Sequence, residues 1–304
     1  LFSKKLSKLG MIKMSLSCFL QKLIFSTLVL IISMNTLASE STDKEGKADN
    51  EAKEDKGELK STWLNLDEST LSEIESYGND YKSYIYAAPT ELSFVSETIR
   101  RVEKRGFEKL TINSTLEAGT RFYDVNRDRT ISLIVIGKRD LREGLRIIGS
   151  HIDSPRLELK GRPIYEKQEF ALFQTYIHGG IKNYQWVNIP LAIIGRVDKK
   201  DGSVVNISMG FDSADPILIV PDLAPHVDHK NRERTSRNVI KKEELDVLIA
   251  SKPTLEMTVK KYVIDFLSNE YQISVEDLVS AELALVPAMK PRDVGFDRSM
   301  IAAY

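Results

Sequence analysis

The sequence predicts a mixed α/β fold, and three features of the 304-residue chain indicate it. Apolar residues recur at three- and four-residue spacing over 66–77 and 91–105, which is typical of amphipathic helices. From residue 121 onward the pattern changes to short apolar or alternating runs, which is typical of strands. A polar motif directly follows one of these runs, where α/β folds commonly place their sites.

The composition excludes several classes of function. The net charge is −1 and the pI about 6.5, so nothing indicates a nucleic-acid partner. A hydrophobic content of 42% is enough for one sizeable core or two smaller ones. The only cysteine, Cys18, lies in a segment that we expect to be removed. The mature chain should therefore have no internal disulfide, thiolate metal site or cysteine nucleophile.

The N-terminal segment, 1–38, reads as a secretory signal peptide. Lysines precede an apolar run over 23–34, and small residues at 36–38 offer a cleavage point. The run is shorter than the roughly 20 residues that a membrane span needs, although an uncleaved anchor is the alternative. We expect export to a periplasm or the exterior, with no stable membrane insertion after cleavage. The polar, charged segment 39–61 that follows is expected to be a disordered linker.

The first half of the remaining chain is expected to hold two helices and a hairpin. The second helix, 91–105, should end at Gly106. The hairpin joins 121–125 to 130–136 through a polar turn. A strand over 146–150 should then lead into the sequence GSHIDSPR.

The second half is richer in strand patterns. The expected strands span 170–177, 186–197, 204–210 and 281–286. Pro190 argues that its strand is an edge strand or carries a bulge. An amphipathic helix is expected over 254–271, and loops over 222–242 and 289–304. We interpret His178 as a turn histidine, and Asp293 and Asp297 as solvated loop residues.

The motif GSHIDSPR places a histidine and an aspartate two residues apart. In a strand such residues point to the same face, so His151 and Asp153 should project together. An imidazole nitrogen can bind a metal while a neighbouring carboxylate orients the ring. An ordinary hydrogen-bonded pair is the other interpretation of this spacing.

Four segments carry a resemblance to a known family. They read HIDSPRLELK, TYIHGGIKNYQWVNIPLAIIGRV, DLAPHVDH and SAELALVPAMKPRDVGFDRSMIAAY. In that order they resemble the M18 metalloaminopeptidases, the family of aspartyl aminopeptidase, and the wording at 186–190 is closer to the bacterial branch. The resemblance implies a zinc-peptidase-type catalytic domain. Its first part spans 62–155, and a β-rich dimerisation domain is inserted over 156–280. The chain would return to the catalytic domain over 281–304.

The resemblance also implies an activity and its residues. M18 enzymes resemble two-metal aminopeptidases, usually with zinc, that use an activated water to remove N-terminal residues from peptides. Carried over, His151 is a metal ligand and Asp153 its catalytic neighbour. The resemblance implies a homo-oligomer in which His226 reaches the active site of a partner subunit, although His229 competes for that position. The alternative is that both histidines lie in a solvated loop.

The other metal ligands of the family are expected beyond Tyr304, since His151 alone cannot hold a catalytic zinc, which needs three protein ligands. We therefore expect this chain to be the N-terminal fragment of an aminopeptidase with an incomplete catalytic domain. A non-catalytic dimerisation or binding module, or an inactive truncated paralogue, is the alternative.

Overall fold

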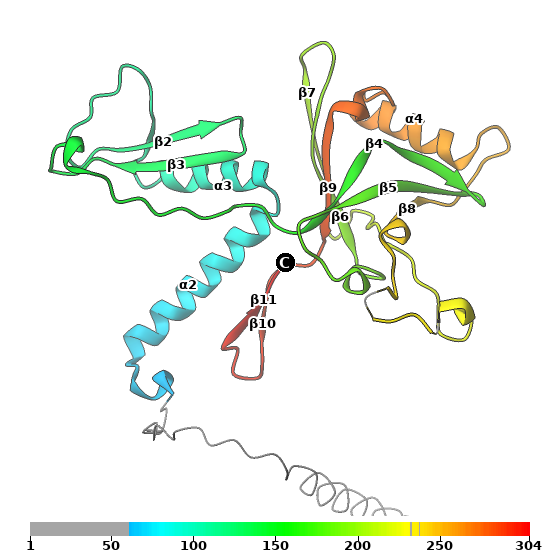
Figure 1. Ribbon diagram of the computed structural model, residues 1–304, viewed down its shortest axis with the longest axis horizontal. Helices are drawn as coiled ribbons and strands as arrows, with labels where there is room; N and C mark the ends of the chain where they lie inside the picture. The colour runs from blue at the N-terminus through cyan, green and yellow to red at the C-terminus, as the bar shows by residue number, and fades with distance from the viewer. Residues whose placement is uncertain (1–60, 232, 237) are drawn as a thin grey trace, which may run out of the picture. The chain divides into compact units, whose positions relative to one another are not determined.

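The computed structural model describes residues 61–304 apart from 232 and 237, in two units that divide after Asn65 (Figure 1). The signal peptide expected over 1–38 and the linker expected up to residue 60 lie outside the described residues. Within the described part of the chain, no helix combines the length and the apolar character that a membrane crossing requires. The first unit contributes one short 3₁₀ helix, η1 (Thr62–Asn65).

The second unit contains all other elements. Its helices are α2 (Glu68–Ala87), α3 (Glu91–Glu103), η2 (Leu141–Glu143), η3 (Asn183–Gln185), η4 (His229–Asn231), η5 (Lys242–Glu244), α4 (Val259–Tyr271) and η6 (Asp277–Ser280). Its strands are β1 (Glu108–Lys109), β2 (Arg121–Asn126), β3 (Thr130–Val135), β4 (Arg156–Lys167), β5 (Phe170–His178), β6 (Leu191–Asp198), β7 (Val204–Met209), β8 (Val247–Ala250), β9 (Ala281–Pro287), β10 (Arg292–Val294) and β11 (Met300–Ala302). The mixed α/β content that the sequence predicts is confirmed.

A six-stranded antiparallel sheet with the order β7-β6-β9-β4-β5-β8 holds the main core. Buried side chains alternate along its strands, as Ala171, Phe173 and Thr175 do in β5. Helix α4 packs across β4, β5 and β8 and buries Val259 and Val263 (Figure 1). The last long strand, β9, lies inside this sheet between β6 and β4.

A smaller sheet, β1-β2-β3, contains the predicted hairpin, which is confirmed. Helix α3 packs against β3, and its first turn is closed by Thr90 and Ser93, whose side chains cap each other's backbone N–H groups. The helix predicted over 91–105 is therefore confirmed, with Gly106 in the left-handed region just after it. These caps fix the start of α3, where Glu91 is the first residue.

Helix α2 is longer than the predicted 66–77, because its backbone hydrogen bonds continue to Ala87, just before Pro89. The predicted apolar stripe is not buried. Leu71, Ile74 and Tyr77 are 38%, 40% and 75% exposed. Periodicity thus predicted the helix but not the burial of its face.

The predicted strand over 146–150 is wrong. This segment has neither strand nor helix structure, and Leu145, Ile147 and Ile148 are 69%, 82% and 101% exposed. A strand exists only where a neighbour accepts its hydrogen bonds, and the described residues provide none beside this segment. An apolar run alone does not supply that partner.

The edge position inferred from Pro190 is also wrong. Strand β6 begins one residue later, at Leu191, and pairs with β7 on one side and β9 on the other. Pro190 needs no N–H donor there, and its carbonyl accepts a hydrogen bond from the Ala288 N–H at 2.9 Å. The proline therefore directly precedes an interior strand, a position that its chemistry allows.

Two expectations for the C-terminal part need correction. The predicted loop 289–304 contains the β10–β11 hairpin. Asp293 is not solvated, because Lys82 and Arg298 both bind its carboxylate, and these contacts lower its pKa. The helix predicted over 254–271 begins only at Val259, and the described residues of the long loop expected over 222–242 contain only η4 and the start of η5.

Gly195 should be essential to the sheet. Its φ is +149°, and a Cβ at this position would lie 1.9 Å from the Glu282 carbonyl oxygen of β9. We expect Gly195→Ala to lower the free energy of unfolding by about 3 kcal/mol or more, because backbone atoms must shift. Gly202→Ala, also at positive φ but with nothing within 4 Å, should cost about 1 kcal/mol. Equal losses in urea denaturation would contradict this explanation.

Glu97 of α3 should make stability depend on acid pH. Its side chain is 8% exposed and pairs with Arg100 and Arg101, and the hydrogen bond from Arg100 is the main cause that lowers its pKa from 4.5 to about 2. A folded-state pKa below the unfolded value gives stability that is complete above pH 4.5 and is lost as the pH falls toward 2. We expect Glu97→Gln to cost about 1–3 kcal/mol at neutral pH and progressively less across that window, measured by denaturation.

Candidate functional site

The loop between residues 149 and 155 carries the predicted His151–Asp153 pair. The loop is not a strand, yet the two side chains meet, since His151 Nδ1 lies 3.2 Å from Asp153 Oδ1 and 3.1 Å from the Asp153 carbonyl oxygen. The His151 ring is 84% exposed. Their expected proximity is thus observed without the expected strand, and their roles in catalysis stay predictions.

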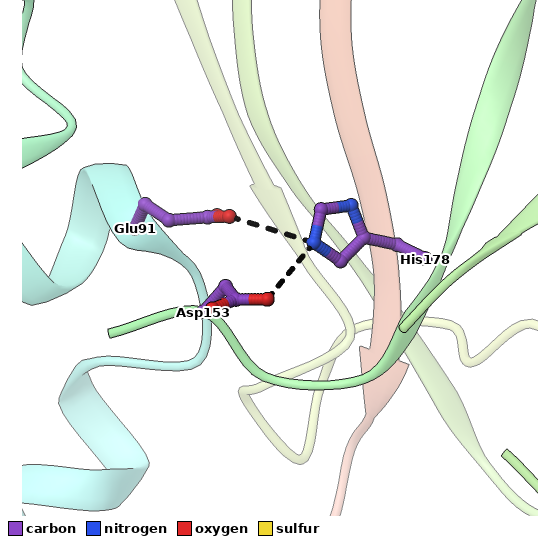
Figure 2. Close-up of side chains that lie close together, drawn as sticks. All are labelled: Glu91, Asp153 and His178. Carbon is purple, nitrogen blue, oxygen red and sulfur yellow. Dashed lines mark hydrogen bonds and ion pairs between the residues drawn. The ribbon is translucent and has the colours of Figure 1, made fainter. Parts of the chain in front are cut away.

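His178 is a residue of the site that sequence reasoning missed. It is the last residue of β5, so its interpretation as a turn histidine is wrong. Its Nε2 lies 3.3 Å from Asp153 Oδ2 and 3.8 Å from Glu91 Oε1 (Figure 2). On the other side of the ring, Nδ1 lies 3.2 Å from Glu158 Oε1. The ring therefore lies among three carboxylates.

The pairing of β4 with β5 explains this position. His178 is the register partner of Arg156, the first residue of β4, and Arg156 directly follows the loop that carries Asp153. A hairpin between the HIDSP segment and the strand 170–177 would have indicated this proximity. Glu91 arrives from α3 and has no local sequence signal that relates it to the loop.

Arg156 is the buried cation of the site, with a side chain that is 3% exposed. Its Nη2 donates to Glu91 Oε1 at 2.9 Å and lies 2.6 Å from Glu158 Oε1. Its Nη1 donates to the Ser154 carbonyl oxygen at 3.1 Å. One guanidinium thus joins α3, the loop and β4.

Neighbouring groups fix the charge of two site residues. The hydrogen bond from His178 is the main cause that lowers the pKa of Asp153, so this carboxylate stays ionised. Burial, followed by a hydrogen bond to Glu158, raises the pKa of Tyr176 to about 12. Tyr176 therefore keeps its proton, and its hydroxyl donates a hydrogen bond to Glu158.

Two groups of donors are relevant to a metal ion. Among the residues that the structure describes, Glu91, Asp153 and His178 offer ligand atoms within 4.8 Å of one another. One imidazole and two carboxylates suit zinc chemically, but the Arg156 guanidinium already binds Glu91. At His151, contact with Asp153 occupies Nδ1 and leaves Nε2 as one of the three protein ligands that a catalytic zinc needs.

The other candidate residue, His226, lies in an exposed turn of the 222–228 segment. His229, its competitor in the sequence, is the exposed first residue of η4. Neither observation concerns a partner subunit. The proposed contact of His226 with a partner's active site stays a prediction.

Comparison with known proteins identifies similar chains. A family model described as aminopeptidase I zinc metalloprotease (M18) matches residues 84–304. The chain is 42% identical over 255 residues to a probable M18 family aminopeptidase 1 of Clostridium acetobutylicum, covering 81% of this chain and 55% of that protein. A protein of the same description from Borreliella afzelii is 37% identical over 246 residues, covering 80% and 54%.

Solved structures give the same result. The crystal structure of an M18 family aminopeptidase from Thermotoga maritima superimposes with a TM-score of 0.76 at 36% identity, covering 82% of this chain and 55% of that one. Aminopeptidase I of Borrelia burgdorferi B31 gives a TM-score of 0.71 at 33% identity, covering 81% and 57%. The chain therefore spans about half the length of the relatives it matches.

Arg156 should be required for stability. We expect Arg156→Met to lower the free energy of unfolding by about 3–5 kcal/mol, because Glu91 and Glu158 would be left without their shared cation. Arg142 is a matched control, since its side chain is 90% exposed and it pairs only locally with Asp140. Arg142→Met should cost less than about 1 kcal/mol. Chemical denaturation measures both, and similar losses would contradict the role given to Arg156.

Proposed function

The chain belongs to the M18 family of zinc metallopeptidases, since the family model covers well over half of it, and from this membership we propose that it forms part of a zinc-dependent aminopeptidase. Such an enzyme removes residues from the free N-terminus of peptides. The observation that supports this role most directly is the contact of Asp153 Oδ1 with His151 Nδ1. It is the carboxylate–histidine arrangement that metal-binding imidazoles commonly use.

The two residues have separate tasks in this proposal. His151 binds zinc through Nε2, because Asp153 holds the proton on Nδ1 and fixes the orientation of the ring. A zinc ion held there would supply Lewis-acid chemistry, by lowering the pKa of a water molecule and polarising the scissile carbonyl. Asp153 stays ionised beside His178 and keeps the His151 ring in the tautomer that zinc requires. Asp153 therefore acts on the reaction through His151.

Further ligands are needed for a two-zinc site. Because this chain spans about half the length of its relatives, we assign those ligands to the half that it does not span. A non-catalytic binding module or an inactive paralogue is the competing function, supported by the same coverage. Zinc content and turnover separate the two functions.

The β-rich region is proposed to be the inserted dimerisation domain of a homo-oligomer. Strand β9 belongs to its sheet, so we extend the proposed region from Ser280 to Pro287. Tyr262 and Phe266 of α4 are 47% and 37% exposed, and such aromatic side chains are common in subunit contacts. In this assembly His226 would reach the active site of the partner.

We also propose that the protein is exported, with the lysine-rich and apolar N-terminus as its signal. Its substrates would then be peptides in a periplasm or outside the cell. Cleavage of the signal is tested by measuring the mass of the protein in a membrane-free periplasmic or culture fraction. We expect a mass that lacks residues 1–38. A protein that keeps residues 1–38 and fractionates with the cytoplasm would contradict export.

Zinc binding tests the proposed site. Because the remaining ligands are assigned to the half that this chain does not span, we expect the chain to bind zinc weakly through His151. His151→Ala should abolish this binding, and Asp153→Asn should weaken it about 10- to 100-fold. Titration against a chromophoric chelator measures the affinity, and release of the first residue from aminoacyl anilides measures turnover. Asp140→Asn, in an exposed local ion pair, is the control and should change neither.

The outcomes are distinct. Zinc binding that survives His151→Ala would contradict the ligand assignment. A chain that binds zinc through His151 without turnover supports the assignment of the remaining ligands to the other half of the relatives. A chain with neither zinc binding nor turnover supports the non-catalytic alternative.

A further inference from the structure

His178 has no role in the proposed chemistry, yet its ring has the most carboxylate contacts of the histidines described above. Asp153, Glu91 and Glu158 all lie within 3.8 Å of its two nitrogens. Its side chain is 30% exposed, whereas that of His151 is 84% exposed. A histidine in this setting either binds a cation with these carboxylates or donates a hydrogen bond to them from each nitrogen that carries a proton, which is one nitrogen in the neutral ring.

The contacts of Asp153 decide which role fits. Its Oδ1 faces His151 Nδ1 at 3.2 Å, and its Oδ2 faces His178 Nε2 at 3.3 Å (Figure 2 shows the second contact). The carboxylate is therefore shared between two imidazoles, one through each oxygen. A carboxylate held at Oδ2 cannot rotate without losing that hydrogen bond, so Oδ1 stays directed at His151.

His178 is itself held by the sheet. It ends β5, where it is the register partner of Arg156, and its Nδ1 faces Glu158 of β4 at 3.2 Å. Glu158 also accepts a hydrogen bond from the Tyr176 hydroxyl and binds Arg156. The loop that carries His151 and Asp153 has no such hydrogen-bond ladder. The position of the loop therefore depends in part on its contact with His178, which the sheet holds in place.

We propose that His178 is a positioning residue that holds Asp153 against the candidate zinc ligand His151. The order of contacts is Glu158, His178, Asp153 and His151, and it links β4 and β5 to the loop. The proposal rests on the proposed function for its catalytic meaning. The geometric part is that His178, through Asp153 Oδ1, adds to the preference for a proton on His151 Nδ1 that the Asp153 carbonyl oxygen at 3.1 Å also favours. This part does not depend on zinc.

Metal ligation by His178 is the competing role. It would require the Nε2 lone pair, and a nitrogen that binds metal cannot donate a proton to Asp153. Arg156 already neutralises Glu91 and Glu158, which reduces the need for a second cation. The two roles therefore exclude each other and predict different effects of removing His178.

The first experiment uses the full chain without metal. The chain has four histidines, so the ring nitrogens of His151 can be assigned in ¹⁵N spectra with a His151→Gln variant. Spectra are recorded above the pH range in which histidine usually titrates. We expect the proton of His151 to reside mainly on Nδ1. We expect His178→Phe, which keeps a ring but no donor, to reduce this preference.

His178→Gln is the conservative variant, because its amide can still donate to Asp153. It should restore most of the Nδ1 preference. Tyr165→Phe is the matched control. It removes a 2.6 Å hydrogen bond to the Asp246 carboxylate from the same sheet but does not contact Asp153. This control should leave the His151 spectrum unchanged although it also costs stability.

The second experiment measures zinc affinity in a double-mutant cycle. We expect His178→Phe to weaken zinc binding about tenfold alone. In the Asp153→Asn background the same substitution should have little further effect, because His178 acts through Asp153. If no variant binds zinc, the proposed function fails while the spectra still decide the role of His178.

Three results would overturn the proposal. One is an unchanged His151 spectrum in a folded His178→Phe chain. Another is the same spectral change in Tyr165→Phe, which would indicate a general structural effect. The third is the loss of one equivalent of bound zinc in both His178→Phe and His178→Gln, which would make His178 a ligand.

Discussion

The buried guanidinium of Arg156 is the charge on which the arrangement of the candidate site depends. Taking an ion out of water costs several kcal/mol unless partners compensate, and Arg156 is 3% exposed. Its partners are Glu91 at the start of α3, the Ser154 carbonyl in the loop and Glu158 in β4. Since all of them satisfy one cation, the helix start, the loop and the strand are positioned together.

The sequence predicted the parts of the site that are local. His151 and Asp153 lie two residues apart, so their proximity follows from spacing in either a strand or a loop. His178 contacts Asp153 across 25 residues, and Arg156 contacts Glu91 across 65. These contacts depend on strand register and helix packing, which single-chain periodicity does not encode. The family resemblance supplied the proposed roles of His151 and Asp153, but His178 was interpreted as a turn residue.

The same distinction explains the fold. The hairpin of β2 and β3 was predictable because each strand finds its partner within a few residues. The segment 145–148 also carries apolar residues, but without a partner strand among the described residues these side chains remain exposed. Pro190 led to the wrong prediction of an edge strand, because it lies one residue outside β6, which pairs on both sides. Patterns thus indicate which residues can form a strand, and pairing decides which do.

The central place of β9 has a consequence for the order of folding. The hairpins β4–β5 and β6–β7 form from neighbouring sequence, and β9, which lies between β4 and β6, is the last of the six strands to be synthesised. Leu157 of β4 therefore has no β9 partner until Leu285 has been synthesised, and Ile193 of β6 pairs with Leu285 from the other side. Until β9 arrives, each hairpin exposes an unpaired edge of the kind that promotes association between chains. The six-stranded sheet that includes His178 is therefore complete only after β9, up to Pro287, has been synthesised.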